Sequence, residues 1–259
     1  MIPVQRMPAT HTLTMLCDFR TEKIREAGAT SKVACEQWKA AKPARRHIKG
    51  LLEQMAPGRI RCMYCLDNRG TDIDHFEPKA RTPLRTFCWD NHLLACSHCN
   101  SNAKRDSFPC DPETGVCMLI DPTVDDPADH LKLMPKTGEL KERTSKGWHS
   151  IEVFGLNRDE LREGRADACG MLISGIIRWH DQVLRGKVEA AARTAVILRR
   201  SDFPEVLRTL EGLAGTPRAS ILEDQYFPEA LSAWVASLHH QGSIPPMRTD
   251  SATSLSVRS

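Results

Sequence analysis

The stretch Cys62-Met63-Tyr64-Cys65 and, thirty residues after it, the stretch Cys96-Ser97-His98-Cys99 decide how the middle of this chain folds. Two thiolates three positions apart can bind one tetrahedral Zn²⁺, because a tight turn between them points both sulfur atoms at a common centre. Two such pairs complete a four-sulfur site with no open position for a substrate. We therefore expect the four cysteines to hold one structural zinc ion, whose binding contributes folding free energy.

The distribution of the other cysteines supports a metal rather than disulfides. Seven of the ten cysteines lie between Cys62 and Cys117, and paired cysteines in a reducing compartment usually bind metal. The alternatives are ordinary buried cysteines or a redox pair. His98 is a weaker candidate ligand, because four thiolates already complete the tetrahedron. Cys110 and Cys117 are too far apart for a zinc knuckle and are interpreted as free thiols or a loop pair, with a second metal site as the lesser alternative.

Between and just after the cysteine pairs lie residues suited to phosphodiester hydrolysis. The sequence contains Asp74-His75, then Asn91, and Asn100 directly after the last cysteine. A histidine with a pKa near ~6.5 deprotonates water well at neutral pH, and a Mg²⁺-like cation on oxygen ligands neutralises charge on a phosphate. Taken singly, each of these residues is more typical of a surface pair, a turn or a cap. Only their combination with the two cysteine pairs indicates a hydrolytic site.

That arrangement resembles the HNH (ββα-metal) nuclease family in its zinc-supported form. The family pattern is Cys-x-x-Cys, Asp-His with a proline soon after, Asn, then Cys-x-x-Cys-Asn-x-x-x-Lys, and each element is present here. The resemblance implies that His75 is the general base and that Asn91 fixes the loop and orients the His75 ring. It also implies that Asp74 and Asn100 hold one catalytic Mg²⁺ or Mn²⁺.

Basic residues supply candidate phosphate contacts. Residues 1–60 carry eleven Lys and Arg against five Asp and Glu, whereas the whole chain has a net charge of only +3. A basic segment suits contact with phosphate backbones, although a solvated helical surface explains the same charges. The candidates beside the motif are Lys79, Lys104 and Arg105, and Arg45, Arg46 and Lys49 could extend the contact.

Sequence similarity from about residue 60 to 165 extends beyond the nuclease pattern. Leu119-Ile120-Asp121-Pro122, His130-Leu131 and Ile151-Glu152-Val153-x-Gly155-Leu156-Asn157 resemble the Septu-type HNH subunits of bacterial anti-phage defence. That resemblance implies an ATPase partner subunit of the PtuA type and a nucleic-acid substrate, with DNA preferred. Three alternatives remain: an RNase for structured RNA such as tRNA, a non-catalytic zinc module that binds nucleic acid or protein, and a scaffold subunit whose site has decayed.

The expected fold class is α+β, with a small ββα-metal core flanked by helices. We expect a basic helical region over 1–58, the zinc-supported nuclease core over 59–110, a hairpin plus helices over 111–241, and a disordered tail over 242–259. Residues 1–17 look irregular, and the helical pattern begins at Asp18. Specific expectations are a strand at Leu119-Ile120, a hairpin over Leu131–Glu142, a helix cap at Asn157, and helices around 188–198, 205–213 and 228–239.

The composition fits a globular protein outside the membrane. Hydrophobic residues make up 41 % and charged residues 27 % of the 259 residues, which is ordinary for such domains. No stretch approaches the ~18–20 apolar residues that a membrane helix needs. The first nineteen residues lack the pattern of a signal peptide, so a cytoplasmic location is expected by default.

Overall fold

Three helices form the N-terminal part of the protein in a computed structural model that describes residues 1–223 and 226–240. They are α1 (His11–Glu26), α2 (Ser31–Ala40) and α3 (Lys42–Met55). The expectation that residues 1–17 are irregular is wrong for the second half of that stretch. The Thr10 side chain accepts a hydrogen bond from the amide of Leu13 and starts α1 there, as a threonine cap does.

A two-stranded hairpin lies against α3 and carries the central residues of the motif. Strand β1 (Asp72–His75) pairs antiparallel with β2 (His92–Ala95), so that Asp72 faces Ala95 and His75 faces His92. All of β2 is buried, and both strands contact α3. Four α3 residues, Ala44, Ile48, Leu51 and Leu52, are buried, and their spacing of three and four makes one apolar face.

Short irregular helices complete this unit. The 3₁₀ turns η1 (Pro83–Phe87) and η2 (Trp89–Asn91) connect the strands, and a seven-residue π-helical segment, η3 (His98–Lys104), follows β2. The amide of Arg105 bonds to the carbonyl of Asn100, which is the i to i+5 spacing of a π-helix and is often found at functional sites.

A second hairpin and two helices follow. They are α4 (Pro127–His130), β3 (Leu131–Met134), β4 (Glu139–Glu142) and α5 (Ser145–Phe154). The expected hairpin is confirmed, with Leu131 opposite Glu142. The expected strand at Leu119-Ile120 is wrong, because the amide of Ile120 bonds to the Ser150 hydroxyl instead of to a neighbouring strand.

The expected helix cap at Asn157 is also wrong. The Asn157 side chain makes two hydrogen bonds to the backbone of Leu140, a donated one of 2.7 Å and an accepted one of 2.8 Å. These bonds imitate a β-ladder and tie β4 to the turn before the next helix. Arg158 stands at the N-cap, where its side chain makes no capping hydrogen bond.

The remaining described chain is helical, as expected. It comprises α6 (Asp159–Leu184), α7 (Val188–Arg199), α8 (Pro204–Glu211), α9 (Ala219–Leu222) and α10 (Phe227–His240). The long helix α6 packs against α7, α8 and α10, and Trp179 meets Trp234 edge-on with ring centroids 5.2 Å apart. The tail over 242–259 that the sequence predicts to be disordered lies outside the described residues.

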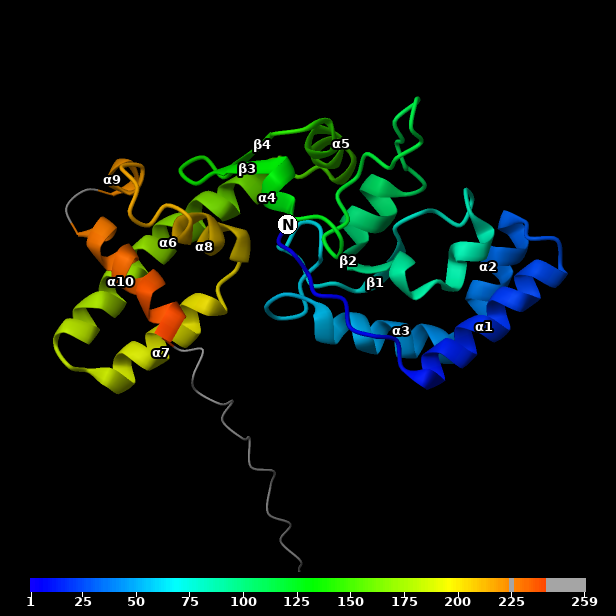
Figure 1. Cartoon of the computed structure of the whole chain (residues 1–259), viewed down its shortest axis with the longest axis horizontal. Helices are drawn as coiled ribbons and strands as arrows, with labels where there is room; N and C mark the ends of the chain where they lie inside the picture. Colours follow the sequence, from blue (N-terminus) through cyan, green and yellow to red (C-terminus); the bar gives the residue numbers. More distant parts are fainter. Residues whose placement is uncertain (224–225, 241–259) are drawn as a thin grey trace, which may run out of the picture.

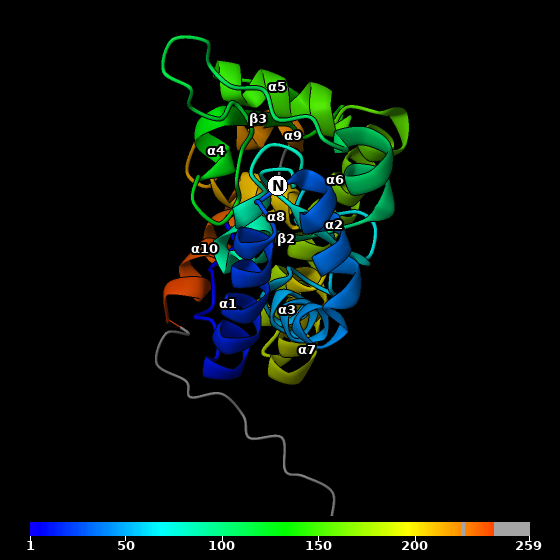
Figure 2. The same ribbon diagram turned by 90° about the vertical axis from the view of Figure 1, so that its right-hand side faces the viewer.

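The two groups of helices occupy opposite ends of the molecule. Helices α1–α3 lie at one end and α6–α10 at the other, with β1 and β2 between them (Figure 1). The view turned by 90° shows α5 and β3 above that middle region (Figure 2). This mixture of helices and two small antiparallel sheets confirms the predicted α+β class. Among the described helices, none is both long and apolar enough to cross a membrane.

Candidate functional site

The four knuckle cysteines come together as one buried cluster. The sulfur atoms of Cys62, Cys65, Cys96 and Cys99 all lie within 4.8 Å of one another. The Cys65 and Cys96 sulfurs are 3.8 Å apart. Ligands at the Zn–S distance of about 2.3 Å in a tetrahedron are separated by roughly 3.8 Å, so the cluster fits a zinc ion. No other group of three or more His, Cys, Asp or Glu side chains meets that distance criterion within the described residues.

Local backbone geometry points the thiols inward. The amide of Cys62 bonds to the Asn68 carbonyl, and Leu66 adopts a left-handed φ of 62° where the chain turns back after the first pair. In the second pair the Cys99 amide donates to the Cys96 sulfur at 3.5 Å. Hydrogen bonds from the neighbouring thiols, that of Cys62 first, lower the pKa of Cys65 well below its usual range. Burial raises the pKa of Cys62, and hydrogen bonds from the neighbouring thiols raise that of Cys99, so metal binding would have to release the protons of these two thiols.

Asp74, on β1, is buried and bonded to two other side chains. Its exposed fraction is 2 %. The Tyr64 hydroxyl donates to one carboxylate oxygen at 2.5 Å, and the Lys104 ammonium donates to the other at 3.1 Å. Burial, followed by the Asp74 carboxylate, raises the pKa of Tyr64 well above its usual value. Tyr64 lies between the first two cysteines, so the cysteine cluster and the Asp74 carboxylate are held by the same turn.

The side chain of Lys104 lies elsewhere than the sequence suggested. It is 1 % exposed, and its ammonium also donates to the His75 carbonyl at 2.7 Å. An enclosed lysine that is held by Asp74 cannot reach a phosphate in solvent. The structure therefore corrects the prediction that Lys104 contacts phosphate: Lys104 neutralises the buried Asp74 and fixes the end of β1.

His75 is held in one orientation by the loop that faces it. Its Nε2 lies 3.0 Å from the Thr86 carbonyl oxygen, which only accepts, so Nε2 carries the proton and Nδ1 is the free base. Nδ1 lies 3.2 Å from the Lys79 ammonium. Burial, followed by the neighbouring His92, lowers the pKa of His75 well below its usual value. The imidazole is therefore neutral at physiological pH, with its basic nitrogen beside a cation.

Asn91 fixes the loop between the strands. Its side-chain oxygen accepts from the Glu77 amide at 2.7 Å, and its amide nitrogen donates to the carbonyls of Glu77 and Arg85 at 3.0 and 3.1 Å. None of these contacts reaches the His75 ring directly. Because Arg85 precedes Thr86, Asn91 acts on the histidine through the backbone that supplies its acceptor.

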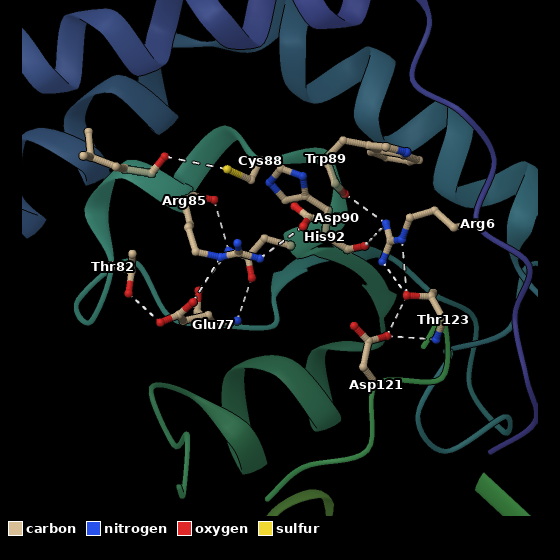
Figure 3. A network of polar contacts seen from close by, with 12 residues as sticks. Arg6, Glu77, Thr82, Arg85, Cys88, Trp89, Asp90, His92, Asp121 and Thr123 are labelled. Carbon is tan, nitrogen blue, oxygen red and sulfur yellow. Dashed lines mark hydrogen bonds and ion pairs between the residues drawn. The ribbon is translucent and has the colours of Figure 1, made fainter. Parts of the chain in front are cut away.

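A second set of contacts secures the same loop from outside (Figure 3). Arg6 donates to the carbonyls of Trp89 and His92 at 2.9 and 3.1 Å, and to the Thr123 hydroxyl at 2.8 Å. That hydroxyl in turn donates to Asp121 at 2.7 Å. The first residues of the chain and the segment after η3 therefore both hold the start of β2.

One cavity of about 630 Å³ brings the motif residues together. Asp74, His75 and Asn100 all line it, so the structure gathers three of the predicted site residues at one surface. The basic residues around the same cavity are Lys42, Arg45, Arg46, Lys49, Lys79 and Arg105. Two of the three predicted phosphate contacts thus lie at the cavity, and Lys104 does not.

The residues that the sequence predicts as ligands of a catalytic cation, Asp74 and Asn100, are already hydrogen-bonded to other side chains. The Asn100 amide donates to Asp72 at 3.3 Å, and Asp72 lines the cavity two positions before Asp74 on the same strand face. A hard divalent ion prefers this kind of carboxylate and amide oxygen. The set fits such an ion if Asp74 exchanges part of its contact with Lys104 for it.

Several residues of the site are absent from the sequence-based prediction. Tyr64 and Asp72 flank predicted ligands and could have been found by their positions in a knuckle and at i−2 on a strand. Trp38 meets His75 edge-on with ring centroids 4.4 Å apart, and nothing in its local sequence signals this. Thr86 acts through its carbonyl, which no motif encodes.

Comparison with known proteins gives partial matches. The chain is 32 % identical over 149 residues to the Septu protein PtuB of Bacillus mycoides (strain KBAB4), covering 46 % of this chain and 50 % of that protein. It is 31 % identical over 117 residues to the Septu protein PtuB of Bacillus thuringiensis, covering 43 % and 42 %. The matches thus span about half the length of these relatives. No family model matches, and no solved structure matches. The chain therefore has moderate homology to Septu protein PtuB over less than half of its length.

Proposed function

We propose that this protein is a metal-dependent HNH endonuclease and the nuclease subunit of an anti-phage defence system. The observation that carries the proposal is the single cavity lined by Asp74, His75 and Asn100 under a basic helix. Two antiparallel strands followed by a short helix, with a thiol cluster beneath them, are the arrangement that the HNH pattern implies. The partial homology to Septu protein PtuB supports the defence role beside an ATPase of the PtuA type.

In the proposed mechanism His75 accepts the proton of the attacking water. Its Nδ1 is unprotonated because Nε2 donates to the Thr86 carbonyl, and the low pKa keeps the ring neutral. Lys79 lies at that nitrogen in the structure, so an incoming phosphate must attract the ammonium for water to approach. Lys79, Arg105 and Arg46 then contact the phosphate oxygens.

Asp74 and Asn100 are the residues that would hold the catalytic cation, with Asp72 as a further carboxylate. A bound Mg²⁺ or Mn²⁺ stabilises the negative charge that develops on the phosphate and on the departing oxygen. The structural zinc has no part in the chemistry. Its four thiolates hold Tyr64 and thereby the Asp74 carboxylate.

The test is a plasmid-nicking assay with His75→Ala. With Mg²⁺ or Mn²⁺, we expect a loss of at least about 10²-fold in rate, the usual contribution of a general base. His98→Ala is the matched control, because His98 lies in the same segment but does not line the cavity. Both variants should keep the zinc content and circular dichroism of the parent. Full activity of His75→Ala would contradict the mechanism.

The same assay tests whether the substrate is DNA or RNA. The protein, with and without an ATPase of the PtuA type, is incubated with duplex DNA and with total tRNA. Cleavage of DNA that depends on His75 supports the proposal, and His75-dependent cleavage of tRNA alone replaces it with an RNase. Zinc binding without cleavage of either polymer would indicate a non-catalytic module.

A further inference from the structure

Cys110 and Cys117 face each other across a small hairpin outside the thiol cluster. They are partners in an isolated antiparallel bridge. The Asp111 amide donates to the Val116 carbonyl at 2.9 Å, and the Met118 amide donates to the Pro109 carbonyl at 2.8 Å. These two bonds flank the cysteine pair on either side. The cysteines therefore occupy a non-hydrogen-bonded position of the ladder.

That position suits a covalent link between the two sulfurs. Directly opposite residues of this kind have Cα atoms about 4.5 Å apart, and disulfides join Cα atoms separated by roughly 4.4–6.8 Å. No large backbone movement is then required to form the bond. The chain has already met the main entropic cost, which is bringing the two ends of the loop together.

The turn between the cysteines is organised by its own side chains. The Asp111 carboxylate accepts hydrogen bonds from the amide of Thr114 at 2.8 Å, from its hydroxyl at 2.9 Å, and from the amide of Glu113 at 3.1 Å. Gly115 has a left-handed φ of 69°, which glycine adopts without strain. The turn therefore holds the two thiols opposite each other before any bond forms.

The pair is also accessible, unlike the zinc-site cysteines. Cys110 and Cys117 are half-buried, and residues 112–116 between them are exposed. All four cluster cysteines are buried. A small oxidant therefore reaches the hairpin thiols before the cluster thiols.

We propose that Cys110 and Cys117 form a reversible disulfide by exchange with a low-molecular-weight disulfide such as oxidised glutathione. The Cys110 thiolate attacks one sulfur of oxidised glutathione and releases one glutathione thiol. The Cys117 sulfur then attacks the Cys110 sulfur of the mixed disulfide and releases the second. The two cysteines lose two protons and two electrons, and these convert one oxidised glutathione into two thiols.

The surroundings of the two cysteines indicate which thiol attacks first and how close the disulfide lies to the candidate site. Burial raises the pKa of Cys117 to about 11, which makes Cys110 the first nucleophile. Phe108, two positions before Cys110, meets Phe76 edge-on with centroids 5.7 Å apart, and Phe76 follows His75. The disulfide would therefore form beside the candidate site, but its formation does not depend on nuclease activity.

The test uses the full chain loaded with zinc and equilibrated with glutathione buffers of increasing oxidised fraction. After alkylation and trypsin digestion, residues 106–132 form one peptide that contains both cysteines. We expect this peptide to lose two hydrogen atoms and to escape alkylation while the zinc content stays constant. Native protein should reach half oxidation at a glutathione ratio at least about tenfold more reducing than urea-unfolded protein does, because the hairpin holds the thiols together.

Three variants control the interpretation. Cys110→Ser should give glutathione on Cys117 and no internal bond. Gly115→Ala strains only the turn, because no atom lies within 4 Å of the added Cβ. It should bring the glutathione ratios at which native and unfolded protein are half oxidised closer together. Cys35→Ser should behave as the parent, since Cys35 lies on helix α2. Separate glutathione adducts on both hairpin cysteines, or equal midpoints for native and unfolded protein, would overturn the proposal.

Discussion

At the scale of single residues, the burial of Lys104 is what the sequence could not reveal. Lys104 is the lysine of the pattern Cys-Asn-x-x-x-Lys, and its charge beside the motif suggested a phosphate contact. The π-helical turn of η3 directs its ammonium inward, where Asp74 and the His75 carbonyl accept from it. Spacing predicts which residues could bind a cation, but the direction of one side chain depends on this local widening of the helix.

A substitution of Lys104 tests that arrangement. Lys104→Met leaves the Asp74 carboxylate buried without its cation, and removing one partner of such a pair costs about 3–5 kcal/mol of unfolding free energy. Urea denaturation of the zinc-loaded protein measures the loss. The double variant Lys104→Met with Asp74→Asn should regain a large part of it. A Lys104→Met protein within about 1 kcal/mol of the parent would mean that the ion pair is not formed.

At the scale of elements, the β1–β2 hairpin packs against α3, and its second strand ends directly before Cys96 of the cluster. Each strand has four residues, and an isolated hairpin of that size is marginal in water. The spacing of the two C-x-x-C pairs predicts a structural zinc that contributes the missing folding free energy. The register, with His75 opposite His92, could not be predicted, because it is set by the loop that η1 and η2 form.

Metal removal tests the role of the cluster. After treatment with EDTA, trypsin should cleave between residues 60 and 105, for example after Arg61 and Arg69, while α6–α10 stay resistant. Mass spectrometry of the digest locates the sites. Added Zn²⁺ should restore protection and added Mg²⁺ should not, because thiolates favour the softer ion. Unchanged resistance after zinc is removed would show that packing alone holds the hairpin.

The buried histidine His92, which pairs with His75 at the end of the hairpin, predicts a loss of folding stability in acid. Burial lowers the pKa of His92 to about 3, and its Nε2 donates to the same Thr86 carbonyl as His75 at 3.0 Å. Below the ordinary value of about 6.5, the unfolded chain binds a proton that the folded chain does not. Stability therefore falls by about 1.4 kcal/mol per pH unit for this histidine as the pH decreases from 6.5 toward 3.

Urea denaturation between about pH 5 and 7 measures that slope, to which the lowered pKa of His75 adds in the same direction. His92→Gln keeps a hydrogen-bond donor but does not titrate. Its unfolding free energy should depend on pH less steeply than that of the parent by about one proton. An equal slope in the two proteins would place the acid sensitivity elsewhere.

At the scale of the whole molecule, sequence patterns predicted the class and the late helices better than the connections between them. Periodicity placed α7, α8 and α10, because one apolar face repeats over several turns. It failed at Asn157 and at Leu119-Ile120, where side chains replace backbone partners from distant parts of the chain. The role of Arg6 was equally hidden, since its contacts are with residues more than eighty positions away. Such contacts form only once the first residues of the chain have folded against its middle part.

The basic residues of α3 beside the cavity predict where the whole protein binds nucleic acid. Lys42, Arg46 and Lys49 follow the spacing of one helix face and line the cavity with His75, and no ion pair among the described residues engages them. If nucleic acid lies along this face, each phosphate contact releases counterions on binding. Replacing all three by glutamine should therefore weaken binding to duplex DNA. The slope of log affinity against log salt concentration should become less negative by about 2 to 3.

Fluorescence anisotropy with labelled DNA at several salt concentrations gives that slope. Arg45 is left in place, because its guanidinium stacks over Trp38, the ring that contacts His75. The matched control replaces Lys132, Lys136 and Lys141, which are exposed on the β3–β4 hairpin, and removes the same total charge. If binding depends on net charge alone, both triple variants flatten the plot equally and α3 is not the binding face. A flattening confined to the α3 variant would place the phosphate backbone across the cavity, within reach of the His75 nitrogen.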